Sequence, residues 1–256
     1  MSDCRLKIDA RRNAILKKIR QNKRVTVAEL SHELDATGAT IRNDLSVLEQ
    51  EGHLVRTQGG AILLQKFHNP TDLTTNIPNP TSKLAIACAV SEMIQDGDTL
   101  FINSGTTTAC VADALKCHKD LKIVTNSLAV ANTLADISSL RVTLLGGDLN
   151  ARYGFTYGSI TQDLLSQFQA NWAILSVDGL SPIGGITTYH SEEAILDRMM
   201  INGAQNTLIV ADRGKLGHIG FSRICDCNGL TLVTNSSPET GITVQLKECG
   251  LHIKYV

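Results

Sequence analysis

The sequence lacks any apolar run near the roughly 18 consecutive residues that a membrane-spanning helix requires. It also lacks a signal peptide at its start, because Met1 to Arg12 is polar and charged rather than an apolar core before a cleavage site. Hydrophobic residues make up 43% and charged residues 19% of the 256 residues, as is ordinary for a globular protein. These observations predict a cytoplasmic protein with no membrane partner.

A cysteine framework is absent as well. The seven cysteines form no Cys-x2-Cys pair, and their odd number favours reduced thiols over disulfides. Cys225 and Cys227 lie close in sequence, but no further clustered metal ligands accompany them. We therefore expect no bound metal.

Sharp catalytic motifs are also missing. The sequence has no Gly-x-Ser-x-Gly nucleophile elbow, no P-loop and no His-Glu-x-x-His motif. His190, Glu192 and Glu193 open a predicted helix, where a carboxylate would serve equally well as an acid or base or as a partner of the helix dipole. We expect no enzymatic activity and no cofactor.

The net charge of −1 conceals an uneven distribution along the chain. Residues 1–66 hold 12 Lys and Arg against 8 Asp and Glu, whereas the remainder holds 12 against 17. A basic small domain joined to an acidic larger one is typical of a phosphate-binding head on a globular body, although a solvated helix face explains the charge alone equally well.

Two predicted helices separated by a tight turn lie in the basic region. Thr26 and Glu29 form a Thr-x-x-Glu capping box at the start of the first helix, whose apolar residues are Val27, Leu30 and Leu34. Residues 35–37 supply the turn. This arrangement predicts a helix-turn-helix.

The second of these helices has an apolar stripe and a polar face. Ile41, Leu45 and Leu48 are spaced to pack inward, which leaves a short polar surface suited to a DNA groove. We expect contacts to double-stranded operator DNA from Thr26, Thr37, Thr40, Arg42, Asn43, Ser46 and Arg56.

The flanking elements complete a winged helix. A first amphipathic helix is predicted over residues 9–21, and Gly52 lies where a C-terminal cap is expected. Residues 53–64 predict a hairpin with a Gly59-Gly60 turn. The hairpin either places Arg56 near phosphate or the minor groove, or merely covers the helical core.

Residues 65–82 hold three of the five prolines, with many Thr and Asn, and predict a linker.

Beyond the linker, strand-like apolar runs alternate with helical patterns, which favours an α/β domain with a mainly parallel sheet. The expected organisation is a DNA-binding domain over 1–64, a linker over 65–82 and an α/β domain over 83–256. The predicted strands are 99–102, 121–124, 142–145, 172–177, 208–211, 230–233 and 251–256, and the predicted helices lie near 83–95, 107–117, 128–136, 159–168, 191–204 and 238–249.

A hydroxyl-rich loop follows the strand 99–102 and leads into a helix. Backbone N–H groups and the helix dipole at such a position attract anions, so the loop predicts a phosphate or carboxylate site, with a plain capped turn as the alternative. Further polar loops follow other strands of the same sheet and are expected to converge on one crevice. The predicted ligand-binding residues are Asn103, Ser104, Gly105, Thr106, Thr107, Thr108, Asn126, Gly147, Asp178, Gly179 and Lys215.

One spaced pattern covers the predicted helices of the basic region: Arg11-x3-Ile15-x3-Ile19, then, after seventeen residues, Thr37-x2-Thr40-Ile41-Arg42-Asn43-Asp44-Leu45. Further characteristic runs are Gly59-Gly60-Ala61, Asp96-Gly97-Asp98-Thr99, Ser104-Gly105-Thr106-Thr107, Val124-Thr125-Asn126-Ser127, Leu145-Gly146-Gly147 and Ala211-Asp212. In these residues the chain resembles the DeoR-type bacterial regulators of sugar metabolism.

The resemblance implies a winged-helix domain and an effector domain similar to ribose-5-phosphate isomerase. It further implies a repressor that a phosphorylated sugar releases from operator DNA, assembled as a homodimer or homotetramer. In this comparison, Ser104 to Thr108 hold the phosphate, and Asp178, Gly179 and Lys215 line the pocket. The alternative is a sugar-phosphate isomerase-like enzyme with an appended DNA-binding domain.

Three departures from the family pattern concern specificity. Asn103 stands where many relatives carry Asp, and Gly214-Lys215 where many have Ser-Lys. Asn43 stands where many relatives carry a second Arg. Asparagine is suited to adenine and arginine to guanine, so we expect an operator sequence different from that of the Arg-bearing relatives. Residues 42–44 and 190–198 look most like the branch that regulates amino-sugar or galactitol catabolism.

Overall fold

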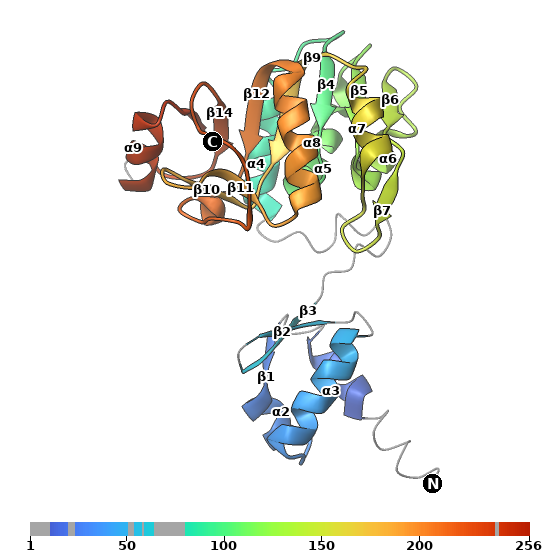
Figure 1. Ribbon diagram of the computed structural model, residues 1–256, viewed down its shortest axis with the longest axis vertical. Helices are drawn as coiled ribbons and strands as arrows, with labels where there is room; N and C mark the ends of the chain where they lie inside the picture. The colour runs from blue at the N-terminus through green and yellow to red at the C-terminus, as the bar shows by residue number, and fades with distance from the viewer. Residues whose placement is uncertain (1–10, 20–23, 51–53, 58, 64–79, 239–240) are drawn as a thin grey trace. The chain divides into compact units, whose positions relative to one another are not determined.

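The computed structural model describes residues 11–19, 24–50, 54–57, 59–63, 80–238 and 241–256 of the chain. The chain divides into two compact units, residues 1–68 and 69–256. Figure 1 shows their elements, with the first unit in blue. No helix among the described residues has the length and apolar character needed to cross a membrane.

The first unit is a winged helix-turn-helix. Residues 11–19 are helical, and β1 (Arg24–Thr26), α2 (Val27–Glu33), α3 (Gly38–Gln50), β2 (Leu54–Thr57) and β3 (Gly60–Leu63) follow. The three strands form an antiparallel sheet in the order β1-β3-β2. The predicted hairpin is therefore present, and Gly52 lies outside the described residues. Sequence analysis missed β1, because three residues are too few to show an alternating pattern and Thr26 also caps α2.

The capping box and the apolar stripe form as predicted. Thr26 Oγ1 accepts from Glu29 N at 3.2 Å, and Glu29 Oε2 accepts from Thr26 N at 2.9 Å. Ile41, Leu45 and Leu48 are buried with Ile15, Ile19, Leu30 and Leu54 in one core. Packing of this stripe fixes which face of α3 points outward.

A seven-stranded parallel sheet forms the centre of the second unit. Its order is β15-β14-β12-β9-β4-β5-β6, and every neighbouring pair is parallel. The strands are β4 (Thr99–Ile102), β5 (Lys122–Thr125), β6 (Arg141–Leu144), β9 (Ala170–Ser176), β12 (Ala204–Val210), β14 (Thr231–Thr234) and β15 (His252–Tyr255). The expected α/β domain with a mainly parallel sheet is confirmed.

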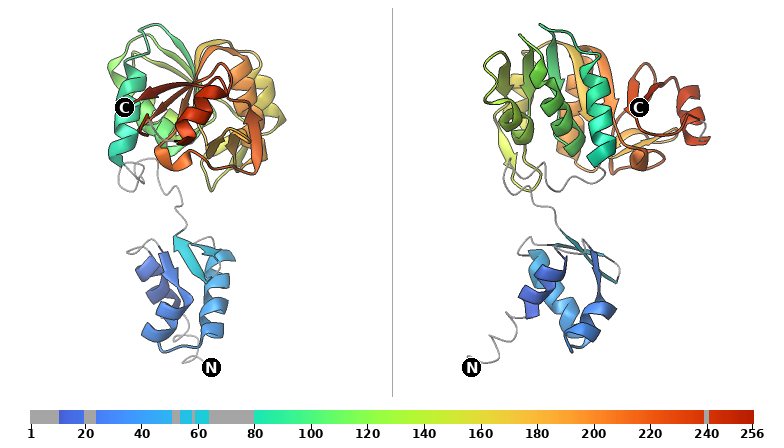
Figure 2. Two further views of the ribbon diagram at one scale, coloured as in Figure 1. Left: turned by 90° about the vertical axis from the view of Figure 1, so that its left-hand side faces the viewer. Right: turned by 180° about the vertical axis from the view of Figure 1, so that it is seen from behind.

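Helices cover both faces of this sheet (Figures 1 and 2). One buried cluster joins the sheet to α4 (Pro80–Ser91), α5 (Thr106–Ala114) and α6 (Leu128–Leu134). The other joins it to α7 (Ser159–Leu165), α8 (Ser191–Asn202) and α9 (Gly241–Glu248). Short 3-10 turns, η2 (Leu115–Cys117) and η3 (Arg213–Lys215), follow α5 and β12.

The strand order has a switch point at its centre. From β4 the chain proceeds to β5 and β6 on one side, and then returns to β9 on the other side of β4. Connections that leave in opposite directions open a crevice beyond the carboxyl ends of the two central strands. The loops after β4 and β9 therefore meet there.

The structure differs from the expected boundaries in two respects. Helix α4 begins at Pro80, inside the predicted linker, because proline suits the first position of a helix. The loops after β6, β9 and β12 also contain short antiparallel strands that sequence analysis missed: β7 (Asp148–Asn150), β8 (Phe155–Tyr157), β10 (Gly179–Ser181), β11 (Gly185–Thr188) and β13 (Ser222–Cys225).

Candidate functional site

The outward face of α3 carries the predicted DNA-reading side chains. Arg42 and Asn43 are exposed, while Thr40 and Ser46 are half-buried. Thr37 Oγ1 accepts from Thr40 N at 3.2 Å and so holds the first turn of the helix. Arg56 lies in β2, but its side chain is outside the described part of the chain.

Thr26 and Ser46 have local partners in addition to any role at DNA. Thr26 Oγ1 caps α2, and Ser46 Oγ donates to Arg42 O at 2.9 Å. These two bonds stabilise the backbone of α2 and α3. Arg42 and Asn43 are the exposed polar side chains of this face.

Asp44 connects α3 to the helical residues 11–19. Its carboxylate is buried and accepts from Arg11 Nε at 2.5 Å and from Arg12 Nε at 3.1 Å. A buried carboxylate with two guanidinium partners fixes the packing of the helices. Two of the basic residues that suggested phosphate binding therefore have a structural partner.

The loop after β4 leads into α5 at the switch point. Gly105 precedes the helix with a φ of 154°, and no side chain caps the helix start. A Cβ on Gly105 would lie 2.6 Å from Ser176 Cβ, so only glycine fits between the loop and β9. The first N–H groups of α5 thus lack a side-chain acceptor, which favours an anion.

Lys83 reaches this helix start from α4, and sequence analysis missed it. Its side chain is only 5% exposed, and its Nζ donates to Thr106 Oγ1 at 2.6 Å. Burial lowers the pKa of Lys83, which Asp212 partly offsets and the positive charge of Lys215 reinforces. Within the described residues, Lys83 forms no ion pair.

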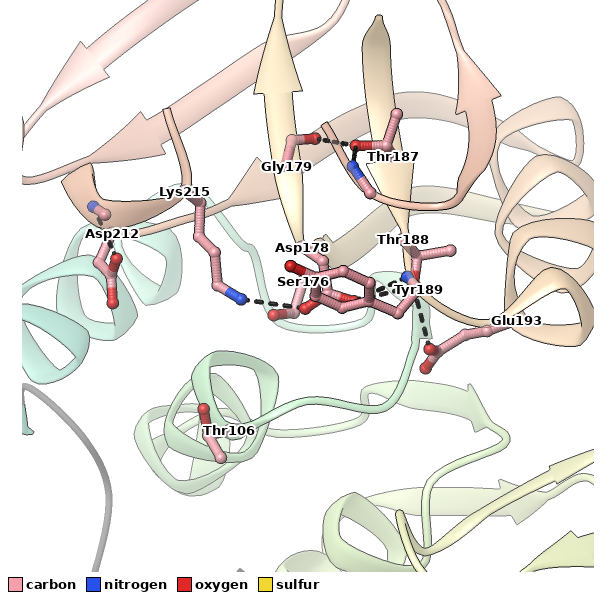
Figure 3. Close-up of polar contacts among 12 residues, drawn as sticks. Thr106, Ser176, Asp178, Gly179, Thr187, Thr188, Tyr189, Glu193, Asp212 and Lys215 are labelled. Carbon is pink, nitrogen blue, oxygen red and sulfur yellow. Dashed lines mark hydrogen bonds and ion pairs between the residues drawn. The ribbon is translucent and has the colours of Figure 1, made fainter. Parts of the chain in front are cut away.

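Lys215 and Asp178 form a second group of side chains, in the same region as Thr106 at the start of α5 (Figure 3). Lys215 Nζ lies 3.0 Å from Asp178 Oδ1 in an ion pair. Asp178 Oδ2 accepts from Tyr189 N at 3.0 Å and from Thr188 Oγ1 at 3.1 Å. Lys215 comes from η3, Asp178 follows β9, and Thr188 ends β11, so three segments distant in sequence meet here.

Glu193, in the first turn of α8, lies beside this group of side chains. Its carboxyl contacts Ser104 Oγ and, at 3.3 Å, Thr188 Oγ1. Burial raises the pKa of Glu193 to about 7, and the nearby Asp178 charge adds to this effect. A carboxyl that is partly neutral near pH 7 donates as well as accepts hydrogen bonds.

Asn103 has a structural role rather than the predicted place in the pocket. It is fully buried, and its Nδ2 donates to Ser176 O and to Asp197 Oδ1, both at 2.9 Å. Its Oδ1 accepts from Ser176 N at 2.9 Å. Because both amide hydrogens are used, the side chain joins β4 to β9 and α8.

The structure brings Ser104, Gly105, Thr106, Asp178 and Lys215 together, whereas the side chains or backbones of the other predicted residues are taken up by internal packing. Thr107 and Thr108 are buried in α5, and Thr108 Oγ1 donates to Gly105 O at 3.1 Å. The remaining three residues lie close to neighbouring backbone or side-chain atoms. Asn126 donates to Thr156 O. Gly147 adjoins Thr161 and Tyr157, and Gly179 adjoins His218 O.

Some of this site was accessible from sequence and some was not. Glu193 follows a helix start that already suggested acid–base chemistry or capping. His190, by contrast, packs with Tyr153 and Phe155 at ring-centroid distances of 4.3 and 5.7 Å. No sequence signal distinguished Lys83 from the solvated lysines that commonly border a linker.

Models of known families match both units. The model described as "DeoR-like helix-turn-helix domain" matches residues 11–67, and "DeoR C terminal sensor domain" matches residues 78–236. The chain belongs to the DeoR family. The predicted resemblance is confirmed, without resolving the branch of the family.

The relatives of this DeoR-family chain include two repressors. The glycerol-3-phosphate regulon repressor of Escherichia coli (strain K12) is 35% identical over 83% of this chain and 84% of its own length. The HTH-type transcriptional repressor GlcR of Bacillus subtilis (strain 168) is 30% identical over 94% of this chain and 93% of its own length. These relatives are transcriptional repressors, not enzymes.

Among solved structures, ribose 5-phosphate isomerase A of Methanocaldococcus jannaschii aligns with a TM-score of 0.40 and 12% identity, covering 54% of this chain and 55% of that chain.

Proposed function

We propose that this protein is a transcriptional repressor of an operon for carbohydrate uptake or catabolism, and that a phosphorylated sugar releases it from operator DNA. Family membership and the names of the two relatives support the repressor role. The first unit binds double-stranded DNA, and the second senses the effector.

The observation that carries the effector proposal is the buried amine of Lys83 at the uncapped start of α5. A buried ammonium whose burial the Asp212 charge offsets only in part costs free energy, and Lys215 and the positive end of the helix dipole lie nearby. A phosphate dianion would interact favourably with Lys83 and the helix start, and also with Lys215, whose charge Asp178 already shares. We therefore assign the phosphate to Lys83, Lys215 and the residues 104–106.

The neighbouring carboxyl groups suit the sugar. Asp178 accepts hydrogen bonds, while Glu193 is able to donate as well as to accept near pH 7. Sugar hydroxyl groups likewise donate and accept, so both residues are suited to orient a polyol beside the phosphate.

On DNA, α3 would enter the major groove and present Arg42 and Asn43 to base edges or phosphates. A homodimer or homotetramer would place two such helices on two half-sites. The effector releases the DNA only if it binds the DNA-incompetent arrangement more tightly.

Two measurements on the purified full chain test this proposal. The first is a thermal-shift screen with glycerol 3-phosphate, glucosamine 6-phosphate, tagatose 6-phosphate and fructose 1-phosphate, since a ligand at 100 times its Kd adds about 2.7 kcal/mol of stability. The second is the Kd for an operator duplex selected from random DNA, with and without each compound. Stabilisation together with weaker DNA binding supports the proposal; unchanged DNA affinity with every compound contradicts it.

A further inference from the structure

The side chain of Asn235 joins the two elements that carry Lys83 and Lys215, the lysines of the proposed phosphate site. Asn235 follows β14, and its Nδ2 donates to Ser82 Oγ of α4 at 2.7 Å. Its Oδ1 accepts from Arg213 N of η3 at 2.9 Å. One amide therefore connects α4 to η3.

Each end of this bridge adjoins a lysine of the proposed phosphate site. Lys83 follows Ser82 in α4, and Lys215 is the last residue of η3. The turn η3 is itself held by Asp212, whose Oδ1 accepts from Gly214 N at 2.9 Å. The backbones that carry the two ammonium groups are thus tied to each other through Asn235 rather than through direct contact of the lysines.

The position of α4 in the chain gives this bridge its significance. Residues 64–79 lie between the described parts of the two units, and α4 is the first described element after them. The first turn of α4 is therefore the described part of the second unit that lies nearest in sequence to the DNA-binding unit. Neither η3 nor α5 lies so near to it in sequence.

We propose that Asn235 is a positioning residue that couples anion binding at Lys83 and Lys215 to the affinity of the protein for DNA. This inference rests on the proposed function. An anion held by both lysines shifts η3, and the Asn235 bridge makes the first turn of α4 follow it. An amide suits this task because it donates at one end and accepts at the other.

The test compares the operator Kd with and without effector for full-length variants. The effector probe is whichever of the four sugar phosphates named above most weakens operator binding by the wild type. The wild-type ratio is expected to be about 5- to 150-fold. Asn235→Ala and Ser82→Ala should reduce this ratio at least ~3-fold, as expected for the loss of a coupling contact.

Two further variants separate coupling from simple structural damage. Ser82→Thr retains the hydroxyl and should retain the wild-type ratio. Asn206→Ala removes an exposed asparagine of β12 whose Nδ2 bonds Asn171 O at 3.4 Å, and it should also leave the ratio unchanged. In the absence of effector, all four variants should bind the operator with wild-type affinity.

The outcomes distinguish this inference from the proposed function. A wild-type ratio of one with every sugar phosphate overturns the proposed function and, with it, the coupling role. A wild-type response that persists unchanged in Asn235→Ala and Ser82→Ala overturns the coupling role alone. Loss of the response in Ser82→Thr as large as in Ser82→Ala also contradicts it, because the hydroxyl would then be irrelevant.

Discussion

Lys83 Nζ lies 2.6 Å from Thr106 Oγ1, so a buried cation from α4 abuts the first residue of α5. Both the ammonium group and the start of the helix favour negative charge, because the Asp212 charge offsets the burial of Lys83 only in part and no side chain caps α5. Two positive groups therefore meet at the proposed phosphate site, and a bound phosphate would interact favourably with both.

The first prediction concerns this amine. Lys83→Met keeps the length of the side chain but removes its charge, so effector affinity should fall about 10- to 100-fold, as for loss of a hydrogen bond to a charged group. Operator binding without effector should not change. Isothermal titration with the active sugar phosphate measures the first quantity, and Lys122→Met, at an exposed position in β5, is the matched control. If Lys83→Met and Lys122→Met bound the effector with equal affinity, Lys83 would not be part of the phosphate site.

The second prediction is a pH dependence from Glu193. Its pKa rises from 4.5 to about 7 on folding, so the folded protein holds this proton over a range in which the unfolded chain has lost it. The associated stability is fully present below pH 4.5 and is lost as the pH rises to about 7. The change is at most about 1.4 kcal/mol per pH unit.

Glu193→Gln cannot titrate and serves as the comparison. Denaturant unfolding between pH 5 and pH 7 should show a smaller loss of stability for this variant than for the wild type. Identical pH dependence would show that Glu193 is ionised throughout this range. Asp197, whose pKa burial also raises, contributes in the same direction to both proteins.

The third prediction separates structure from recognition on α3. Asp44→Ala leaves Arg11 and Arg12 without their buried partner and should destabilise the first unit by about 2 kcal/mol. Hydrogen exchange of the α3 amides in the full chain measures this effect. The exposed Arg42→Ala should retain wild-type exchange and lose operator affinity instead. If hydrogen exchange became faster in Arg42→Ala and not in Asp44→Ala, Arg42 rather than Asp44 would be the structural residue.

The fourth prediction concerns operator sequence. Asn43→Ala should weaken operator binding, and Asn43→Arg should shift the preferred base at the contacted position from adenine toward guanine. A correct bidentate contact contributes about 1 to 3 kcal/mol of discrimination. Selection from a random duplex pool compares the wild type with Asn43→Arg. The same consensus from both proteins would place Asn43 outside the base-reading surface.

Local patterns were sufficient to predict much of the fold. The Thr26–Glu29 capping box depends on three-residue spacing, and the stripe at Ile41, Leu45 and Leu48 depends on helical periodicity. Each strand of the central sheet is a short apolar run next to a turn signal, so the parallel sheet was also predictable. β1 was not, because its pairing with β3 depends on residues more than thirty positions away.

The site was predicted less completely, because burial and tertiary contacts determine it. Ser104, Thr106, Asp178 and Lys215 follow or adjoin strand ends, where topology brings loops together. Asn103 looked equally well placed, but its amide is used up by Ser176 and Asp197. The burial of Lys83 depends on how α4 packs against α5, which no local pattern indicates.

The most direct test of the account is the effector response of a pocket variant. Thr106→Ala combined with Lys215→Ala removes the hydroxyl that Lys83 contacts and one of the two ammonium groups. Fluorescence anisotropy of a labelled operator duplex would be followed during titration with the active sugar phosphate. We expect the wild type to release the duplex, with the operator Kd rising about 5- to 150-fold. The double variant should bind the operator with wild-type affinity and not release it; release at the wild-type effector concentration would contradict the proposed site.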